Sequence, residues 1–139
     1  MNRCKARFLS LILLAGFLLV TCDDEDQIIP YVPVSFSVNL NVVNDLNVPG
    51  NSVYFAGPGF GGVIIYCELP GSYYAFDAAC THEVSAGCKV KNDGVLGTCP
   101  CCGSQFILMG GGYPSKGPAT FPLQSYHVSV MNNFLRVYN

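Results

Sequence analysis

The sequence has few charged side chains and very few basic ones outside its first residues. Its 139 residues include 7 Lys and Arg, 9 Asp and Glu, 2 His and no Trp. Arg3, Lys5 and Arg7 stand at the start, so only four basic residues are spread over the rest of the chain. Nucleic-acid binding needs a basic surface that neutralises phosphates. The sequence therefore excludes a nucleic-acid-binding domain.

Long apolar runs are also rare, and the single clear one lies near the N-terminus. Residues 8–20 form a 13-residue run, which is too short to span a bilayer as a helix but is typical of a signal peptide after a basic start. The following LVTC, residues 19–22, resembles a bacterial lipobox. We therefore predict a lipoprotein signal peptide over 1–21 and a lipidated Cys22, whose acyl chains would be the only membrane attachment. A plain secretory signal is the alternative.

The residues after Cys22 carry most of the acidic charge. Residues 23–27 read DDEDQ, and carboxylates so close together repel one another, so we predict a solvated tether over 22–31. Without the signal peptide, four basic and nine acidic residues give a net charge of −5. The acidic run resembles the surface-export signal of Bacteroidota-type lipoproteins, although a simple spacer would look the same. We expect the protein to be anchored in the bacterial cell envelope, at the outer membrane, on its periplasmic or its surface side.

Residues 32–139 show no amphipathic helix, no internal repeat and no second domain, and they predict a single all-β domain. Residues 32–42 alternate apolar and polar side chains, which is the period of a half-buried strand. Further strand patterns cover residues 53–56, 62–67, 73–77, 126–131 and 134–138. The glycines of 57–62 lack the lysine of a phosphate-binding loop and are interpreted as turn residues. His127 lies within a strand pattern and is interpreted as structural.

Cysteine is the one residue type that is unusually frequent, with eight in the chain. Cys4 lies in the signal peptide and Cys22 is the predicted lipidation site, which leaves six: Cys67, Cys80, Cys88, Cys99, Cys101 and Cys102. In an exported chain six cysteines suggest disulfides, for which 15 pairings exist. The spacing also suggests a metal centre, because CTH (80–82) and CPCC (99–102) form two short loops that each offer a pair of soft ligands.

These motifs resemble the Rieske iron–sulfur family. The family pattern is Cys-x-His, some 15 to 17 residues, and then Cys-x-x-His within C-P-C-H-G-S-x-F. This chain has CTH at 80–82 and CPCCGSQF at 99–106, and YYAFDAACTH before the first loop is also similar. Residues 111–128 resemble the family's proline loop, including Pro114, Gly117 and Pro118. The resemblance covers about residues 53–139 and implies a Rieske-type antiparallel β-sandwich with a small two-loop cluster-binding subdomain.

The resemblance also implies a [2Fe–2S] cluster, with one departure in its ligands. Carried over by position, Cys80 and Cys99 would bind the inner iron, and His82 and Cys102 the outer iron. Cys102 stands where the family has its second histidine. Three cysteines and one histidine also bind [2Fe–2S] clusters in the CDGSH proteins. A thiolate adds negative charge, so the expected potential lies below the Rieske range.

The resemblance gives roles to the remaining cysteines and to the proline loop. In Rieske proteins of cytochrome bc complexes, each cluster loop carries an extra cysteine and the two form a disulfide. Cys101 matches the position of the extra cysteine in the second loop. Cys88 lies three residues later than the position of the extra cysteine in the first loop. A Cys88–Cys101 disulfide would brace the two loops, and the proline loop would cover the cluster. Cys67 is then left as a buried free thiol.

Three functions follow from these residues. The first is a [2Fe–2S] electron-transfer carrier whose redox donor and acceptor are unknown. The second is a cluster-free surface domain for binding or structure, with Cys99 and Cys102 oxidised, and the third is a Cys₃His zinc site. The signal lacks the Arg-Arg pair of the twin-arginine route, by which folded cluster proteins are exported, and this counts against the first. No nucleophile-and-base pair is apparent, so we expect a carrier or binding domain rather than an enzyme.

Overall fold

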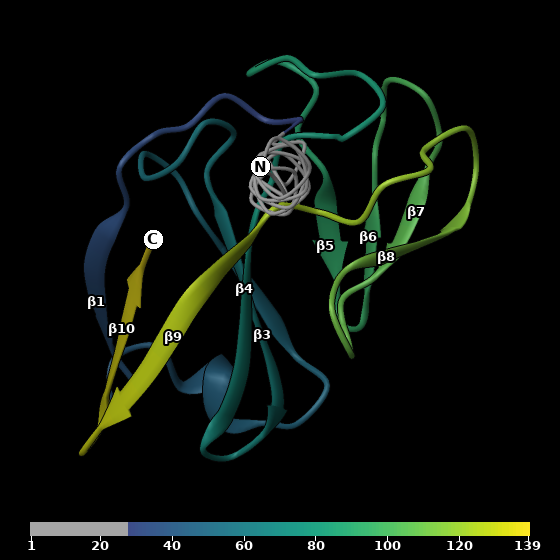
Figure 1. The fold of residues 1–139 in the computed structure, drawn as a ribbon. Coiled ribbons are helices and arrows are strands. Elements are labelled where there is room, and N and C mark those ends of the chain that lie inside the picture. The colour runs from purple at the N-terminus through teal and green to yellow at the C-terminus, as the bar shows by residue number, and fades with distance from the viewer. Residues whose placement is uncertain (1–27) are drawn as a thin grey trace, which may run out of the picture.

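The computed structural model describes residues 28–139, which form antiparallel strands and one short 3₁₀ helix, η1 (Asn44–Asn47) (Figure 1). The predicted signal peptide, Cys22 and residues 23–27 of the predicted tether lie outside the described residues. Within residues 28–139 no helix is long and apolar enough to cross a membrane. The strands are β1 (Ser35–Asn39), β2 (Ser52–Phe55), β3 (Val63–Leu69), β4 (Ser72–Asp77), β5 (Lys91–Asp93), β6 (Leu96–Thr98), β7 (Gln105–Ile107), β8 (Tyr113–Lys116), β9 (Ser125–Met131) and β10 (Phe134–Tyr138).

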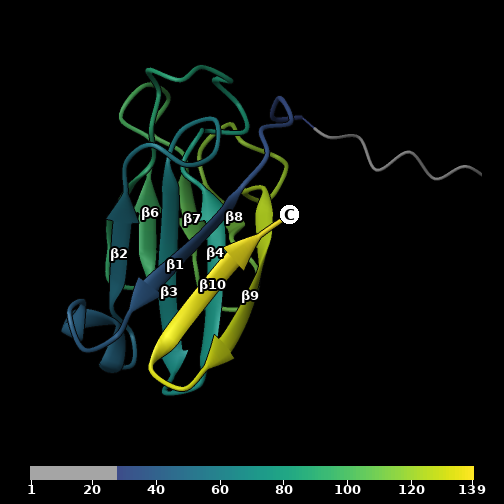
Figure 2. The ribbon, with the colours of Figure 1, turned by 90° about the vertical axis from the view of Figure 1, so that its left-hand side faces the viewer.

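The larger sheet has six strands in the order β1-β10-β9-β4-β3-β2. Only two residue pairs join β9 to β4, Ala75 with Tyr126 and Phe76 with Ser125. The sheet bends at this short junction, so that β1 and β10 cross in front of β3 and β4 while β9 runs beside β4 (Figure 2). The two halves of the sheet therefore face each other as layers of a sandwich.

Strand β3 lies between the two cores of the domain, so both of its faces are buried. Val63 and Ile65 point into a core shared with Leu135 and Val137 of β10. Ile64 belongs to a second core on the opposite face. Alternate side chains of a strand point to opposite faces, so a strand covered on both sides must be apolar throughout, as residues 63–67 are.

The smaller sheet has four strands in the order β5-β6-β7-β8 and packs over the second core (Figure 1). Phe106 of β7 and Leu108 are completely buried there beside Phe76 of β4. The first cysteine loop, residues 78–90, leaves the end of β4, and the second, residues 99–104, connects β6 to β7. The second core thus extends to the bases of both loops.

Most of the strand predictions correspond to observed strands, with shifts at their ends. The alternating segment predicted over 32–42 is a strand only over Ser35–Asn39, and the turn expected at 44–45 is the 3₁₀ helix η1, which buries Leu46. Strands β5, β6, β7 and β8 were not predicted; each has only three or four residues, too few for a periodic pattern to develop.

Packing begins before the predicted domain boundary at residue 32. Ile29, within the segment predicted as a tether, is only 2% exposed. Val34, just before β1, is likewise buried, and its backbone N–H donates to the side-chain oxygen of Asn139. The described chain therefore packs against the domain from Ile29 onward.

Candidate metal centre

The first cysteine loop begins at the end of β4 and is fixed by backbone pairing. Ala79 forms an antiparallel bridge with Lys89, and the Cys80 N–H donates to the Cys88 carbonyl over 3.2 Å. Both ends of the loop are therefore held together at its base. Cys80, at the base, is completely buried, whereas the side chain of His82 two residues later is exposed.

The second cysteine loop is a tight turn between β6 and β7. The Cys99 N–H donates to the Ser104 carbonyl over 2.8 Å, and the Gly103 N–H donates to the Cys99 carbonyl over 2.9 Å. Gly103 has φ +74°, a conformation that glycine adopts without strain. This turn buries Cys99 completely and leaves Cys102 partly exposed.

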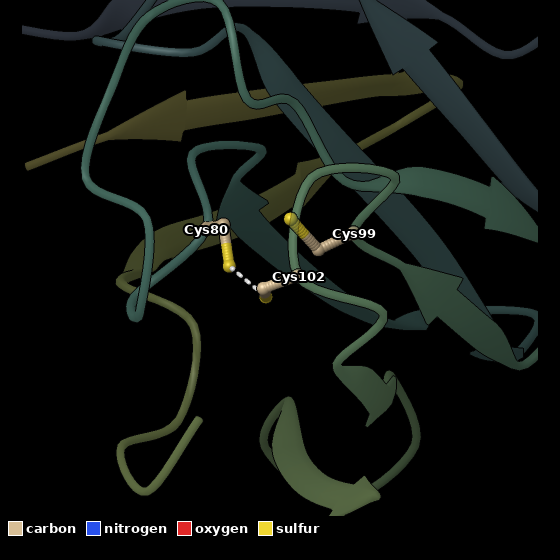
Figure 3. A group of neighbouring side chains, drawn as sticks. All are labelled: Cys80, Cys99 and Cys102. Carbon is tan, nitrogen blue, oxygen red and sulfur yellow. Dashed lines mark hydrogen bonds between the residues drawn. The ribbon is translucent and has the colours of Figure 1, made fainter. Parts of the chain in front are cut away.

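The two loops bring three thiols together (Figure 3). The Sγ atoms of Cys80, Cys99 and Cys102 all lie within 4.8 Å of one another. Cys80 and Cys102 point toward each other, with 3.6 Å between their sulfurs. Among the described residues these three, with Cys67, are the free cysteines.

His82 does not belong to this group, although it lies only two residues from Cys80. Its ring nitrogens are not among the ligand atoms that gather within 4.8 Å. Its role as a fourth ligand stays a prediction from the family pattern. The other histidine, His127, lies on β9 with its ring 5.3 Å from that of Tyr138.

A disulfide joins the two cysteine loops. Cys88 and Cys101 are bonded, with 5.8 Å between their Cα atoms. This is the pairing that the family resemblance implies. Cys67, on the central strand β3, is buried and unpaired.

Residues 117–121 lie against both cysteine loops. The Ala119 N–H donates to Ser104 Oγ over 3.0 Å, and Thr81 Oγ1 donates to the Phe121 carbonyl over 2.8 Å. A Cβ at Gly117 would stand 2.6 Å from the Cα of Ser104, so only glycine allows this approach. Of the other predicted proline-loop residues, Pro114 lies in β8 and Pro118 is exposed.

Ser104 links this covering segment to the site. It is completely buried, and its Oγ lies 3.1 Å from Cys102 Sγ while also accepting the hydrogen bond from Ala119. Ser104 belongs to the CPCCGSQF motif of residues 99–106, but the motif alone predicts no role for it. The Gly103-Ser104 pair, which matches the G-S of the family pattern, is the sequence signal that could have identified this residue.

The environment makes two of the thiols differ in acidity. Burial raises the pKa of Cys80 to about 12. Desolvation also acts to raise the pKa of Cys102, but hydrogen bonds from the side chain and backbone of Ser104 and the adjacent thiols outweigh it and bring that pKa below its ordinary value. Binding of a metal ion would release a proton from Cys80, because only a thiolate is a strong ligand.

The three thiols fit a thiolate-bound metal. Thiolates are the ligands that zinc and iron–sulfur clusters prefer. Around a tetrahedral ion with metal–sulfur distances of about 2.3 Å, two sulfurs lie roughly 3.8 Å apart, close to the 3.6 Å between Cys80 and Cys102. The spacing of Cys80 and Cys102 therefore suits a single ion, such as zinc, that both thiolates bind.

Comparison with solved structures gives the fold. A chain in the complex of reduced oxygenase and oxidized ferredoxin of carbazole 1,9a-dioxygenase matches with a TM-score of 0.54 and 24% identity, over 76% of this chain and 93% of that one. The fold is Rieske-type. The ferredoxin of carbazole 1,9a-dioxygenase from Nocardioides aromaticivorans IC177 matches with a TM-score of 0.50 and 21% identity, over 78% of this chain and 98% of that one.

A ferredoxin of Sphingomonas yanoikuyae B1 also matches, with a TM-score of 0.48 and 20% identity over 66% of this chain and 88% of that one. No family model and no curated protein matches the sequence. The similarity to the two carbazole 1,9a-dioxygenase structures gives the fold alone.

Proposed function

We propose that this chain is an electron-transfer carrier that binds a [2Fe–2S] cluster. The observation that carries the proposal is the gathering of three thiols, from two loops of a Rieske-type fold, within 4.8 Å of one another. Rieske-type domains hold their clusters with such loops. When bound, the cluster would accept and release one electron.

The family pattern assigns each ligand a place. Cys80 and Cys99, both completely buried, would hold the inner iron, and His82 and Cys102 the outer one. The thiolate of Cys102 would place the potential between the Rieske range of roughly −150 to +300 mV and the value near −400 mV of all-cysteine plant-type clusters. Its contact with Ser104 would stabilise the thiolate charge.

The carrier would exchange electrons with separate donor and acceptor proteins and perform no catalysis itself. The exposure of His82 supports this, because a ligand at the protein surface shortens the path to a docked partner. One of the similar structures is described as a complex of an oxygenase with a ferredoxin.

We also propose that the carrier is lipid-anchored in the bacterial cell envelope through Cys22. The basic start, the apolar run of residues 8–20 and the LVTC motif support this proposal. Cys22→Ser should release the protein from the membrane fraction, because no acyl chain would then be attached. Equal membrane association of Cys22→Ser and the parent protein would contradict it.

A second candidate is a structural zinc site formed by the same thiols. The observation that favours it is that His82 lies outside the group while the three sulfurs are spaced as around one ion. The cluster-free alternative would instead oxidise two of the thiols, Cys99 and Cys102 as expected from the sequence, whose sulfurs lie within 4.8 Å of each other.

Spectroscopy of the full chain, purified without oxygen, tests the carrier. We expect visible absorption bands that bleach on reduction and an electron paramagnetic resonance signal from the reduced form. His82→Ala should change that signal if the histidine binds iron. A colourless protein without a signal would overturn the carrier in favour of the zinc or disulfide form.

A further inference from the structure

Asp77 is a completely buried carboxylate at the end of β4, three residues before Cys80. Its Oδ1 accepts hydrogen bonds from the backbone N–H groups of Gly61, over 2.9 Å, and Ala79, over 2.8 Å. Its Oδ2 accepts from the Phe60 N–H and the Tyr126 hydroxyl, both over 2.7 Å. Four donors thus converge on one buried side chain.

These donors belong to three separate segments. Phe60 and Gly61 lie in the glycine-rich loop 57–62, which the sequence predicts only as a turn. Ala79 opens the first cysteine loop, and Tyr126 lies at the start of β9, just after the segment that covers the site. The carboxylate therefore ties the cysteine loop to two neighbouring segments.

The glycine loop packs so closely on Asp77 that side chains are excluded from it. A Cβ at Gly59 would lie 2.6 Å from Asp77 Oδ2. A Cβ at Gly61 would lie 2.9 Å from Asp77 Oδ1 and would clash with the backbone nitrogen of Ala79. The loop is therefore shaped around the carboxylate and the start of the cysteine loop.

We propose that Asp77 is a positioning residue for the three-cysteine site. By holding the Ala79 N–H, its carboxylate fixes the backbone that leads into Cys80, so that Cys80 Sγ faces Cys102 Sγ. Tyr126 orients the carboxylate from the other side. The inference rests on the proposed metal binding but not on which metal is bound.

The four donors explain why a carboxylate is needed. An ionised carboxylate is acceptor-only, and two oxygens with about four lone-pair positions can satisfy all four hydrogen bonds. In Asp77→Asn the amide would present its own N–H groups to at least one backbone N–H, and that donor would be left buried without a partner. The start of the cysteine loop would then have to move.

Binding of Co²⁺ to the full chain, freed of metal without oxygen, tests the proposal. Co²⁺ reports its ligands, because the intensity of its sulfur-to-metal charge-transfer band grows with the number of thiolates. The parent protein should show the band of three thiolates. Asp77→Asn should bind Co²⁺ about 10- to 100-fold more weakly, the usual effect of losing a residue that orients a ligand, and should lose about a third of the band as Cys80 withdraws.

Two matched substitutions serve as controls. Asp93→Asn removes the same charge from an exposed position on β5 and should leave affinity and band unchanged. Gly61→Ala should weaken binding as Asp77→Asn does, because its Cβ displaces Ala79, whereas Gly87→Ala, inside the first cysteine loop, meets only Ser85 Oγ at 3.6 Å and should not. If Asp77→Asn fails to fold, the Co²⁺ affinity and band of Gly61→Ala test the positioning role instead.

The outcomes separate this proposal from the proposed function. If the parent protein holds neither iron nor zinc as purified and binds no Co²⁺ with its thiols reduced, the metal centre itself is refuted and the positioning role is refuted with it. If the parent binds but Asp77→Asn and Gly61→Ala keep its affinity, the metal centre stands and the positioning role is wrong. Weaker binding with an undiminished three-thiolate band would also overturn the positioning role, since Cys80 would still be in place.

Discussion

At the residue scale, Cys102 differs from the two other thiols of the site. It is partly exposed, it contacts Ser104 Oγ, and its pKa lies below the ordinary value, whereas Cys80 is buried and its pKa is raised. A stabilised thiolate at the open side of the site suits the ligand position that holds histidine in the Rieske pattern. The chemistry of this one residue therefore decides how far the centre departs from that family.

Cys102→His tests the ligand role of Cys102. We expect the variant to retain a cluster with a higher reduction potential, because imidazole replaces a negatively charged thiolate and the reduced state becomes more favourable. The potential should also fall as pH rises through the titration of the new ring, since reduction becomes coupled to proton uptake. Protein-film voltammetry between about pH 6 and 10 measures both effects.

Cys102→Ala is the companion variant and should give a labile centre, because one iron loses its protein ligand. A Cys102→His potential equal to that of the parent, together with a stable cluster in Cys102→Ala, would show that Cys102 is not a ligand.

The hydroxyl of Tyr126 predicts a dependence of stability on pH. Burial, and then its hydrogen bond to Asp77, raise the pKa of Tyr126 above 10.0 in the folded protein. A raised pKa means that its contribution to the free energy of unfolding is complete below about pH 10 and is lost at higher pH. Tyr126→Phe should thus be less stable by about 2 kcal/mol at neutral pH, and the difference from the parent should shrink above about pH 10.

Urea unfolding of both proteins at about pH 8 and about pH 11 measures this difference. Tyr66 and Tyr73, whose pKa values burial also raises, are present in both proteins, so their contributions cancel in the comparison. A difference that is the same at both pH values would contradict the role given to the Tyr126 hydroxyl.

At the scale of elements, the site is built from two loops that contribute little core of their own. Backbone pairing closes the base of the first loop, a tight turn shapes the second, and the Cys88–Cys101 disulfide joins them. Residues 117–121 add hydrogen bonds to Ser104 and Thr81. The loops are therefore held by covalent and polar contacts in addition to the apolar core at their bases.

Replacing both Cys88 and Cys101 by Ser should destabilise the domain by up to about 3 kcal/mol, as expected for a cross-link with a sequence separation of 13. The same variant should release metal faster, because the loops that carry the ligands are no longer joined. Chemical denaturation and chelator-driven metal release measure the two effects.

Peptide mapping without reductant checks the pairing directly. It should recover Cys88 joined to Cys101, with Cys67 alkylated only after unfolding. Recovery of Cys101 joined to Cys99 or Cys102 would contradict this arrangement of the loops.

At the scale of the whole molecule, the sequence predicted the strands that have a periodic apolar pattern and the loops that carry a cysteine motif. It did not predict the shortest strands or the contacts between residues far apart in the chain. Apolar runs and alternation identified the segments of β3, β4, β9 and β10, and the two cysteine motifs identified both loops. Strands β5–β8 are too short to show a period. Asp77 had no local signal, because its partners Phe60 and Tyr126 lie 17 and 49 residues away in sequence.

Analysis of iron, acid-labile sulfide and zinc in the full chain, purified without oxygen, is the most direct test of the proposed carrier. The three thiols of Cys80, Cys99 and Cys102 predict about two iron and two sulfide per folded chain and no stoichiometric zinc. One zinc per chain without sulfide would contradict the carrier and select the structural zinc site. Absence of both metals, with a disulfide between two of these thiols, would contradict any metal centre.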